Sequence, residues 1–228
     1  GSFFYAIIAG LLPSLIWLFF WLREDTHSQP RSLITSLFFG GMIAVIIAIF
    51  CEKFISLMVA NDQIQYTLWA AVEEIGKFIV VGAIAMNSIN NKEPVDAMIY
   101  CVAAALGFAA LENTLFIMDP FSHGDVARGI VTGNMRFIGA TLVHIVSSAC
   151  VGFTYGYVFY SGKFLKTIAI LIGLAGAIAI HASFNLSILH ANPTDTLKTF
   201  AWIWGAVVFL IILFEEVKAV HMRKLQKA

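Results

Sequence analysis

The segment 70-AAVEEIGKFIVVGAIAM-86 is long and apolar enough to span a membrane, yet it carries three ionisable side chains near its start. These side chains are Glu73, Glu74 and Lys77. A charged side chain near the centre of a bilayer costs about 2.5–3.5 kcal/mol on insertion scales. Such residues in a membrane-spanning helix therefore indicate a functional site in which the charges have partners.

The composition places the whole chain in a membrane. Hydrophobic residues make up 60% of the sequence and charged residues 12%, whereas soluble domains have about 45–50% and about 25%. The formal net charge is zero, so no basic surface points to nucleic acid as a partner. We expect an integral membrane protein whose environment is the lipid bilayer.

The apolar runs predict an all-α polytopic fold. A bilayer requires about 20 apolar residues per helix, and seven runs meet this length: 3–22, 33–50, 66–86, 95–118, 134–160, 165–190 and 199–217. We interpret residues 1–228 as a single transmembrane domain with a catalytic core at about 66–190. Residues 1–2, Gly-Ser, resemble a cloning remnant. The piece 54–60 either continues the second span or lies at the interface.

The basic residues predict the orientation. With the N-terminus outside, the inner segments carry nine Lys and Arg residues and the outer segments carry four. Basic residues gather on the cytoplasmic side of a membrane protein. We therefore expect a multi-pass protein of the cell (plasma) membrane with its N-terminus outside and its C-terminus in the cytoplasm.

The rare polar residues of four predicted spans fall at a similar depth. A helix rises about 1.5 Å per residue, which places six of them about 8–15 Å below the outer face. They are Glu73, Glu74, Glu112, His144, His181 and Asn185. Unrelated polar residues would scatter in depth, so this agreement predicts a polar cavity in the outer half of the bundle.

Helical spacing decides which of these side chains can meet. Lys77 follows Glu73 by four residues and Glu74 by three, so it can pair with either carboxylate. The two glutamates point about 100° apart, so one can face a reaction centre while the other supports it. The remaining shared faces are Phe108 with Glu112, His181 with Asn185, and the stripe Arg136, Thr141, His144 and Ser148.

Each feature taken alone also fits a structural role. A single intramembrane histidine is often a packing residue, and a Glu–Lys pair can be a neutralised structural pair. Asn185 can join helices by hydrogen bonds, and Gly152-x-x-x-Gly156 fits a close-packing face. The coincidence of several costly residues favours a functional site.

Three motifs in order resemble the PrsW family of intramembrane proteases. Glu73-Glu74-Ile75-Gly76-Lys77 is similar to its EExxK motif, and Phe108 to Asn113 is similar to its FxxxEN motif. His181 to Asn185 is similar to its HxxxN/D motif, and Arg136, Thr141 and His144 resemble its polar fifth helix. The family resembles the superfamily of type II CAAX prenyl proteases and bacteriocin-processing membrane proteases.

The resemblance implies an intramembrane endopeptidase. Its implied substrate is a single-span membrane protein, an anti-sigma factor cut at site 1. The related prenyl proteases have EExxxR and FxxxH motifs, and their second-motif histidine helps to hold the attacking water. Here Lys77 stands one residue earlier than that arginine and Glu112 replaces the histidine, so Glu112 or His144 must take this part. Phe108, Asn113, Arg136 and Lys77 are supporting residues.

The residues are compatible with hydrolysis by a glutamate-activated water. A carboxylate in an apolar bundle is a competent general base near neutral pH. His181 and Asn185 can donate hydrogen bonds to the oxyanion. We expect no cofactor, because HExxH is absent and Lys77 adds positive charge that disfavours a dication. Zinc held by Glu73, Glu112, His144 and His181 is the alternative.

Two other classes of function remain open. A proton- or ion-coupled transporter also buries Glu73, Glu74, Lys77 and Glu112 within the membrane, although the sequence has no duplicated halves. A b-type haem protein can use His144 and His181 as axial ligands, but it leaves the glutamates without a role.

Overall fold

The fold is taken from a computed structural model, which describes residues 2–25, 27–189 and 192–226. Gly1, assigned above to a cloning remnant, and His190, the predicted end of the sixth span, lie outside the described residues. The described residues form helices and no strand.

The helices follow one another in simple order. They are α1 (Ser2–Trp21), η1 (Leu22–Glu24), α2 (Arg31–Met58), α3 (Asp62–Val81), η2 (Gly82–Met86), α4 (Pro94–Ser122), α5 (Val126–Met135), η3 (Arg136–Ala140), α6 (Thr141–Tyr157), α7 (Lys163–Leu189) and α8 (Pro193–Leu225). The π-helical turn η2 continues α3, and the π-helical turn η3 joins α5 to α6. This gives seven long helical segments, and the predicted all-α polytopic fold is confirmed.

Six of these segments are long and apolar enough to cross a membrane, and α3 is not among them. The exception is informative, because α3 carries Glu73, Glu74 and Lys77. Several predicted boundaries were too short. Helix α2 continues to Met58, so the piece 54–58 belongs to the second helix, and residues 126–133, predicted as loop, are helical. Helices α4 and α8 also extend beyond the spans predicted for them, 95–118 and 199–217.

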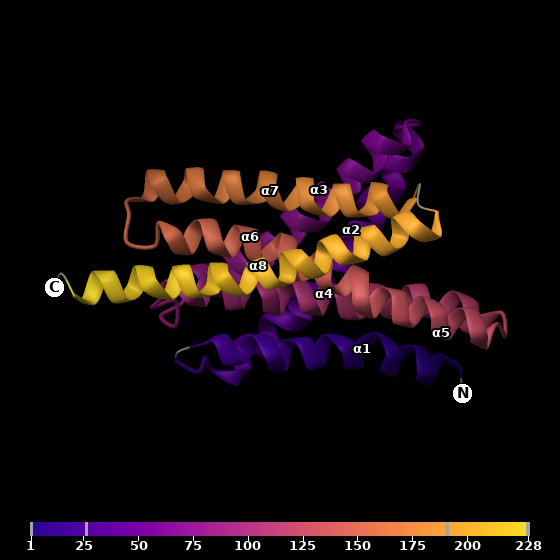
Figure 1. Cartoon of the computed structure of the whole chain (residues 1–228), viewed down its shortest axis with the longest axis horizontal. Helices are drawn as coiled ribbons and strands as arrows, with labels where there is room; N and C mark the ends of the chain where they lie inside the picture. Colours follow the sequence, from indigo (N-terminus) through magenta and orange to yellow (C-terminus); the bar gives the residue numbers. More distant parts are fainter. Residues whose placement is uncertain (1, 26, 190–191, 227–228) are drawn as a thin grey trace.

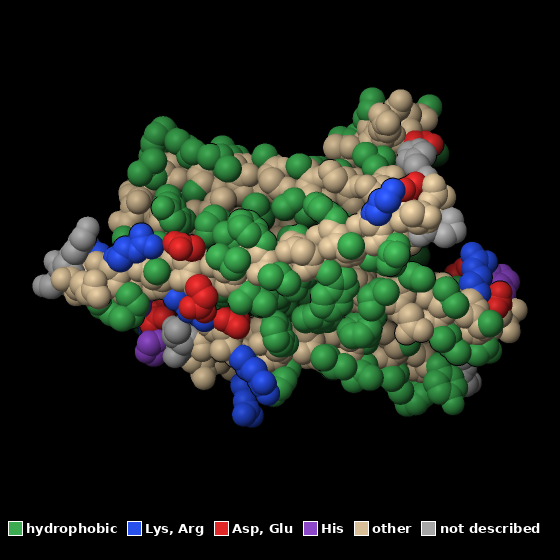
Figure 2. Space-filling view, in the orientation of Figure 1, with side chains coloured by type: hydrophobic (Ala, Val, Ile, Leu, Met, Phe, Trp, Pro, Cys, Tyr) green, Lys and Arg blue, Asp and Glu red, His purple; other side chains and the backbone are tan. Residues whose placement is uncertain are grey.

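The two ends of the chain lie at opposite ends of the bundle. Helix α1 begins at one end of the long axis and α8 ends at the other (Figure 1). On the face drawn in Figure 2, Lys, Arg, Asp and Glu gather towards the two ends, with a band rich in hydrophobic side chains between them. A bundle in a bilayer needs this distribution, because its middle contacts lipid.

Helix α4 is the centre of the bundle. It is buried over nearly all of its length and packs against α1, α2 and α6. Its sequence 101-CVAAALGFAAL-111 is rich in small residues, which let neighbouring helix backbones approach closely. Helix α4 therefore fixes the positions of the helices that carry the candidate site.

Glycines make the closest of these contacts. Gly41 of α2 lies against the backbone of Ala104 in α4, and Gly107 of α4 lies against the backbone of Phe38 in α2. Gly152 and Gly156 of α6 lie against the backbone of α4 in the same way. The close-packing face predicted for Gly152-x-x-x-Gly156 is therefore confirmed.

A methyl group at Gly107 tests the crossing of α2 and α4. We expect Gly107→Ala to destabilise the protein by about 1–3 kcal/mol, because the new Cβ must push the Phe38 backbone away. Gly205→Ala is the matched control: nothing lies within 4 Å of its added Cβ. Alanine there should leave stability unchanged or raise it slightly. Thermal unfolding in detergent measures both, and equal midpoints for the two variants would contradict the crossing.

Candidate active site

The three ionisable residues of α3 are buried in the interior of the bundle. Glu73, Glu74 and Lys77 are 5%, 1% and 1% exposed. Of the two pairings that the spacing allowed, the structure forms the one with Glu74: the Lys77 ammonium donates to Glu74 Oε1 over 2.6 Å. Lys77 therefore neutralises Glu74 and leaves Glu73 without this direct contact.

Glu74 joins three helices through its two oxygens. His181 of α7 lies with Nδ1 2.7 Å from Glu74 Oε1, and Ser148 of α6 donates to Oε2 over 2.8 Å. With Lys77, the carboxylate has three hydrogen-bond partners. A buried charge needs this degree of compensation, and Glu74 is therefore the supporting glutamate of the pair.

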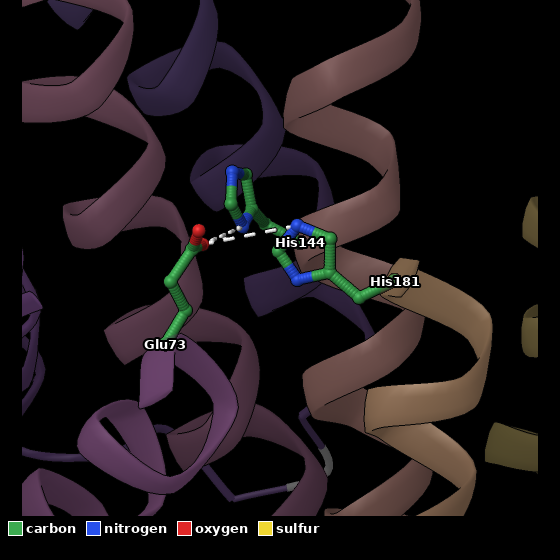
Figure 3. A group of neighbouring side chains, drawn as sticks. All are labelled: Glu73, His144 and His181. Carbon is green, nitrogen blue, oxygen red and sulfur yellow. Dashed lines mark ion pairs between the residues drawn. The ribbon is translucent and has the colours of Figure 1, made fainter. Parts of the chain in front are cut away.

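Glu73 points into the space between two imidazole rings (Figure 3). Its Oε2 lies 3.8 Å from His144 Nδ1 and 3.8 Å from His181 Nε2. The two rings contact each other edge to face, with centroids 4.9 Å apart. Glu73 Oε2 is buried and has no hydrogen-bond partner among the described residues. The three side chains come from α3, α6 and α7 and were predicted to share one depth.

The hydrogen bonds fix which imidazole nitrogens carry protons. Lys77 Nζ lies 3.0 Å from His144 Nδ1, and an ammonium can only donate, so this nitrogen accepts. His144 Nε2 then carries the proton and donates to Glu112 Oε2 over 3.0 Å. His181 donates from Nδ1 to Glu74, so Nε2 of the neutral ring carries no proton. His181 thus turns a lone pair towards Glu73, whereas the lone pair of His144 Nδ1 accepts from Lys77.

Glu112 belongs to a second, partly buried network. Its Oε2 also pairs with Arg136, whose Nε donates to Asn113 Oδ1 over 2.6 Å. Asn113 in turn donates to the hydroxyl of Thr141, which donates to the Arg136 carbonyl. Arg136 opens the π-helical turn η3, and such turns occur frequently at functional sites. Glu112 and Arg136 therefore neutralise each other beside His144.

Two predicted residues lie at the edge of this centre. The Phe108 ring lies 5.4 Å from the His144 ring and 4.8 Å from Lys77 Nζ, measured to its centroid, so it covers the charged cluster on one side. Asn185 is one turn beyond His181 and half-buried. Asn185 makes no side-chain hydrogen bond to a described residue, so its amide is free to meet a substrate.

The donor set fits a metal ion. Single ligand atoms of Glu73, His144 and His181 all lie within 4.8 Å of one another. Two imidazoles and one glutamate form a common catalytic zinc ligand set. Each imidazole is also oriented by a carboxylate at its other nitrogen, a typical outer-shell arrangement. Glu112, the fourth residue of the alternative ligand set, is absent from this cluster. It contacts the other ring nitrogen of His144, Nε2.

The sequence analysis missed Glu52. It lines the same cavity as Glu112, and it fell outside the predicted spans because the second span was ended at residue 50. With α2 extended to Met58, six residues separate Glu52 from the helix end, about 9 Å. That depth matches the other site residues and was the signal that could have identified it.

The fold and the site together define a class. The chain is a multi-pass helical membrane protein with a buried carboxylate and two imidazoles suited to activating water. A family model described as "PrsW family intramembrane metalloprotease" matches residues 29–215. The chain belongs to this family and is a membrane protein of the protease class.

Several relatives named "Protease PrsW" support the assignment. The protein of Geobacillus kaustophilus is 29% identical over 157 residues, covering 67% of this chain and 66% of the relative. The protein of Bacillus subtilis is 22% identical over 219 residues, covering 92% and 91%. The protein of Halalkalibacterium halodurans is 25% identical over 164 residues, covering 70% of each. No solved structure matches this chain.

The buried Glu74–Lys77 pair is open to a direct test. We expect Lys77→Met to destabilise the protein by about 3–5 kcal/mol, because it leaves the Glu74 carboxylate buried without its cation. Lys77→Arg should be milder, since the charge remains but the planar guanidinium does not fit the same contact. The free energy of unfolding in detergent measures both changes.

Lys198→Met provides the matched control. Lys198 pairs with Asp195 at the same three-residue spacing, over 3.0 Å, but both side chains are exposed. Exposed pairs contribute about 1 kcal/mol or less. Equal stability losses in Lys77→Met and Lys198→Met would mean that burial adds nothing to the Glu74–Lys77 interaction.

Proposed function

We propose that this protein is an intramembrane endopeptidase in which Glu73, His144 and His181 hold a catalytic zinc ion. The observation that carries the proposal is the unpartnered Glu73 Oε2, buried 3.8 Å from one nitrogen of each imidazole ring. Electron-rich atoms this close to one another repel unless a cation or a proton lies between them. The description of the family as metalloproteases agrees with a cation.

The charges around the site support a cation in this place. Glu74 is paired with Lys77 and Glu112 is paired with Arg136, so these four charges cancel. Glu73 remains, and the further carboxyl group beside the site is that of Glu52, which lines the same cavity as Glu112. A dication offsets carboxylates that have no basic side chain of their own.

The chain's own residues supply positioning and proton transfer. When bound, zinc polarises the scissile carbonyl and the attacking water. Glu74 orients His181, and Glu112 orients His144. Glu112 Oε2 is occupied by Arg136 and His144, and in this proposal Glu112 uses its other oxygen to take a proton from the water. The Asn185 amide, free of other partners, donates to the oxyanion.

The metal-free mechanism predicted from the sequence is the second candidate. One observation favours it: Lys77 Nζ lies 3.0 Å from His144 Nδ1, and a metal must displace this contact to use that nitrogen. In this version Glu73 takes the proton from water, and His181 and Asn185 bind the oxyanion.

A haem between the two histidines is disfavoured, because their rings contact each other. A transporter function gives no role to the imidazole pair of His144 and His181.

The substrate follows from the position of the site. A reaction centre buried in a membrane bundle meets polypeptides that share the bilayer, so we propose a single-span membrane protein as the substrate. The family resemblance favours an anti-sigma factor. The predicted orientation, N-terminus outside, places the cut in the outer half of the cell membrane.

Proteolysis in reconstituted bilayers tests the function and the mechanism together. Purified enzyme is mixed with single-span membrane proteins, including anti-sigma factors, and new N-termini are identified by mass spectrometry. We expect exhaustive chelation to abolish cleavage and stoichiometric zinc to restore it. Glu73→Gln and His181→Ala should lose both cleavage and bound zinc, because each removes a ligand.

Glu216→Gln is the control, since Glu216 is an exposed residue of α8. It should keep full activity and full zinc content. Cleavage that persists without metal, but is lost in Glu73→Gln and His181→Ala with the fold intact, would replace the zinc mechanism by the glutamate mechanism. Absence of cleavage for all membrane proteins tested, in zinc-loaded enzyme, would contradict the proteolytic function.

A further inference from the structure

The described residues line three large cavities, and only one of them has residues of the candidate active site in its lining. A cavity of about 640 Å³ lies between α1 and α5 and is lined by residues such as Leu12 and Ile130. None of its lining residues belongs to the site. A second cavity of about 600 Å³ is lined by Glu112 and by Glu52. The third, of about 560 Å³, is lined by residues such as Arg23 and Arg31 and by no site residue. The second cavity, between α2 and α4–α5, is called the α2–α4 cleft below.

The cleft arises from the way α2 and α4 cross. The two helices are in backbone contact where Gly41 and Gly107 meet. Further along α2, Ala48 and Ile49 line the cavity, as do Leu115 and Phe116 further along α4. The helices are therefore separated beyond their crossing. The connection between α2 and α3 projects beyond α7 at the upper right of Figure 1, and Figure 2 shows the same projection standing clear of the body.

Glu52 connects the cleft to Glu73. Its carbonyl oxygen accepts a hydrogen bond from Trp69 Nε1 over 3.2 Å, and Trp69 lies one turn before Glu73 on α3. The Glu52 side chain is half-buried and lines the cleft together with Trp69 and Glu112. It has no ion pair with a basic side chain in the described part of the chain. A molecule in the cleft therefore meets Glu52 next to the reaction centre.

The lining of the cleft suits an unwound polypeptide. A helix in a bilayer satisfies its own backbone groups, but a segment extended for cleavage exposes N–H and C=O groups that need partners. Glu52 and Asp119 offer acceptors along the cleft, and Arg128 and Thr132 offer donors. Its apolar walls can cover apolar side chains. The cavity between α1 and α5 has no charged lining residue, so it fits a lipid chain better than an exposed backbone.

We propose that the α2–α4 cleft binds the substrate as an extended stretch of a membrane-anchored polypeptide, and that Glu52 hydrogen-bonds to this stretch beside Glu73. The inference rests on the proposed proteolytic function and assigns its substrate site. Glu52 then contacts the substrate directly, whereas Glu74 acts through His181, which it orients.

Photo-crosslinking locates the bound polypeptide independently of its cleavage. In a background without Cys51, Cys101 and Cys150, a photoreactive thiol label is attached to Ile49→Cys in the cleft. The matched control is Leu12→Cys in the cavity between α1 and α5. The probe is a fluorescent synthetic peptide with one apolar span of about 20 residues and a polar flank. We expect capture at position 49 and not at position 12, in active enzyme and in the Glu73→Gln variant.

A second experiment blocks the cleft and measures the effect on cleavage. A reducible bifunctional thiol reagent joins Ile49→Cys to Leu115→Cys across the cleft, or Leu12→Cys to Ile130→Cys across the cavity between α1 and α5. Joining the first pair should abolish cleavage, reduction should restore it, and bound zinc should not change. Glu52→Leu should raise KM about tenfold with zinc retained, the effect of losing one hydrogen bond to a charged group.

The outcomes separate the two proposals. Capture at position 49 without any cleavage supports the cleft and contradicts the proteolytic function. Capture at position 12, capture at neither position, or unchanged cleavage after the 49–115 pair is joined, overturns the cleft.

Discussion

The site depends on one constraint: Glu74 is a carboxylate buried inside a membrane bundle, and it must be compensated where it lies. It is 1% exposed, and its partners Lys77, His181 and Ser148 come from α3, α7 and α6. Leaving such a charge unpaired costs several kcal/mol. The contact that satisfies Glu74 also sets the rotation of α7 and the tautomer of His181, so a stability requirement creates the geometry of the site.

The other carboxylates of the site differ in this respect. Arg136 compensates Glu112, and Asn113 and Thr141 satisfy the remaining donors and acceptors around it. Glu73 stands apart, because its Oε2 is buried and unpartnered among the described residues. We propose that this carboxylate, which lies between two imidazoles and lacks a partner, is where the chemistry happens. The α2–α4 cleft, lined by Glu52 and Glu112, is the proposed substrate site beside it.

Much of the fold was readable from the sequence, because a bilayer imposes length and polarity on each helix. The common depth of Glu73, His144 and His181 predicted their meeting. Their catalytic roles remain predictions. The choice of Glu74 over Glu73 as the partner of Lys77 was not predictable, since both spacings allow a pair and the neighbouring helices decide.

Other features depended on contacts that no single segment reveals. Glu52 was missed because a short apolar piece after a charged pair fits a loop as well as a helix end. The helical start of the fifth segment was missed because 126–133 is less apolar than the rest. The cleft could not be foreseen, because it follows from the angle at which α2 and α4 cross, and that angle is set by backbone contacts at Gly41 and Gly107.

X-ray absorption at the zinc edge tests the central claim most directly, since it reports the ligands of a bound metal without requiring a substrate. The account predicts scattering from two imidazoles and a carboxylate oxygen in the purified protein. It also predicts loss of one imidazole contribution in each of His144→Ala and His181→Ala. A protein that cleaves its substrate with no bound metal, or a spectrum unchanged in both histidine variants, would contradict the account.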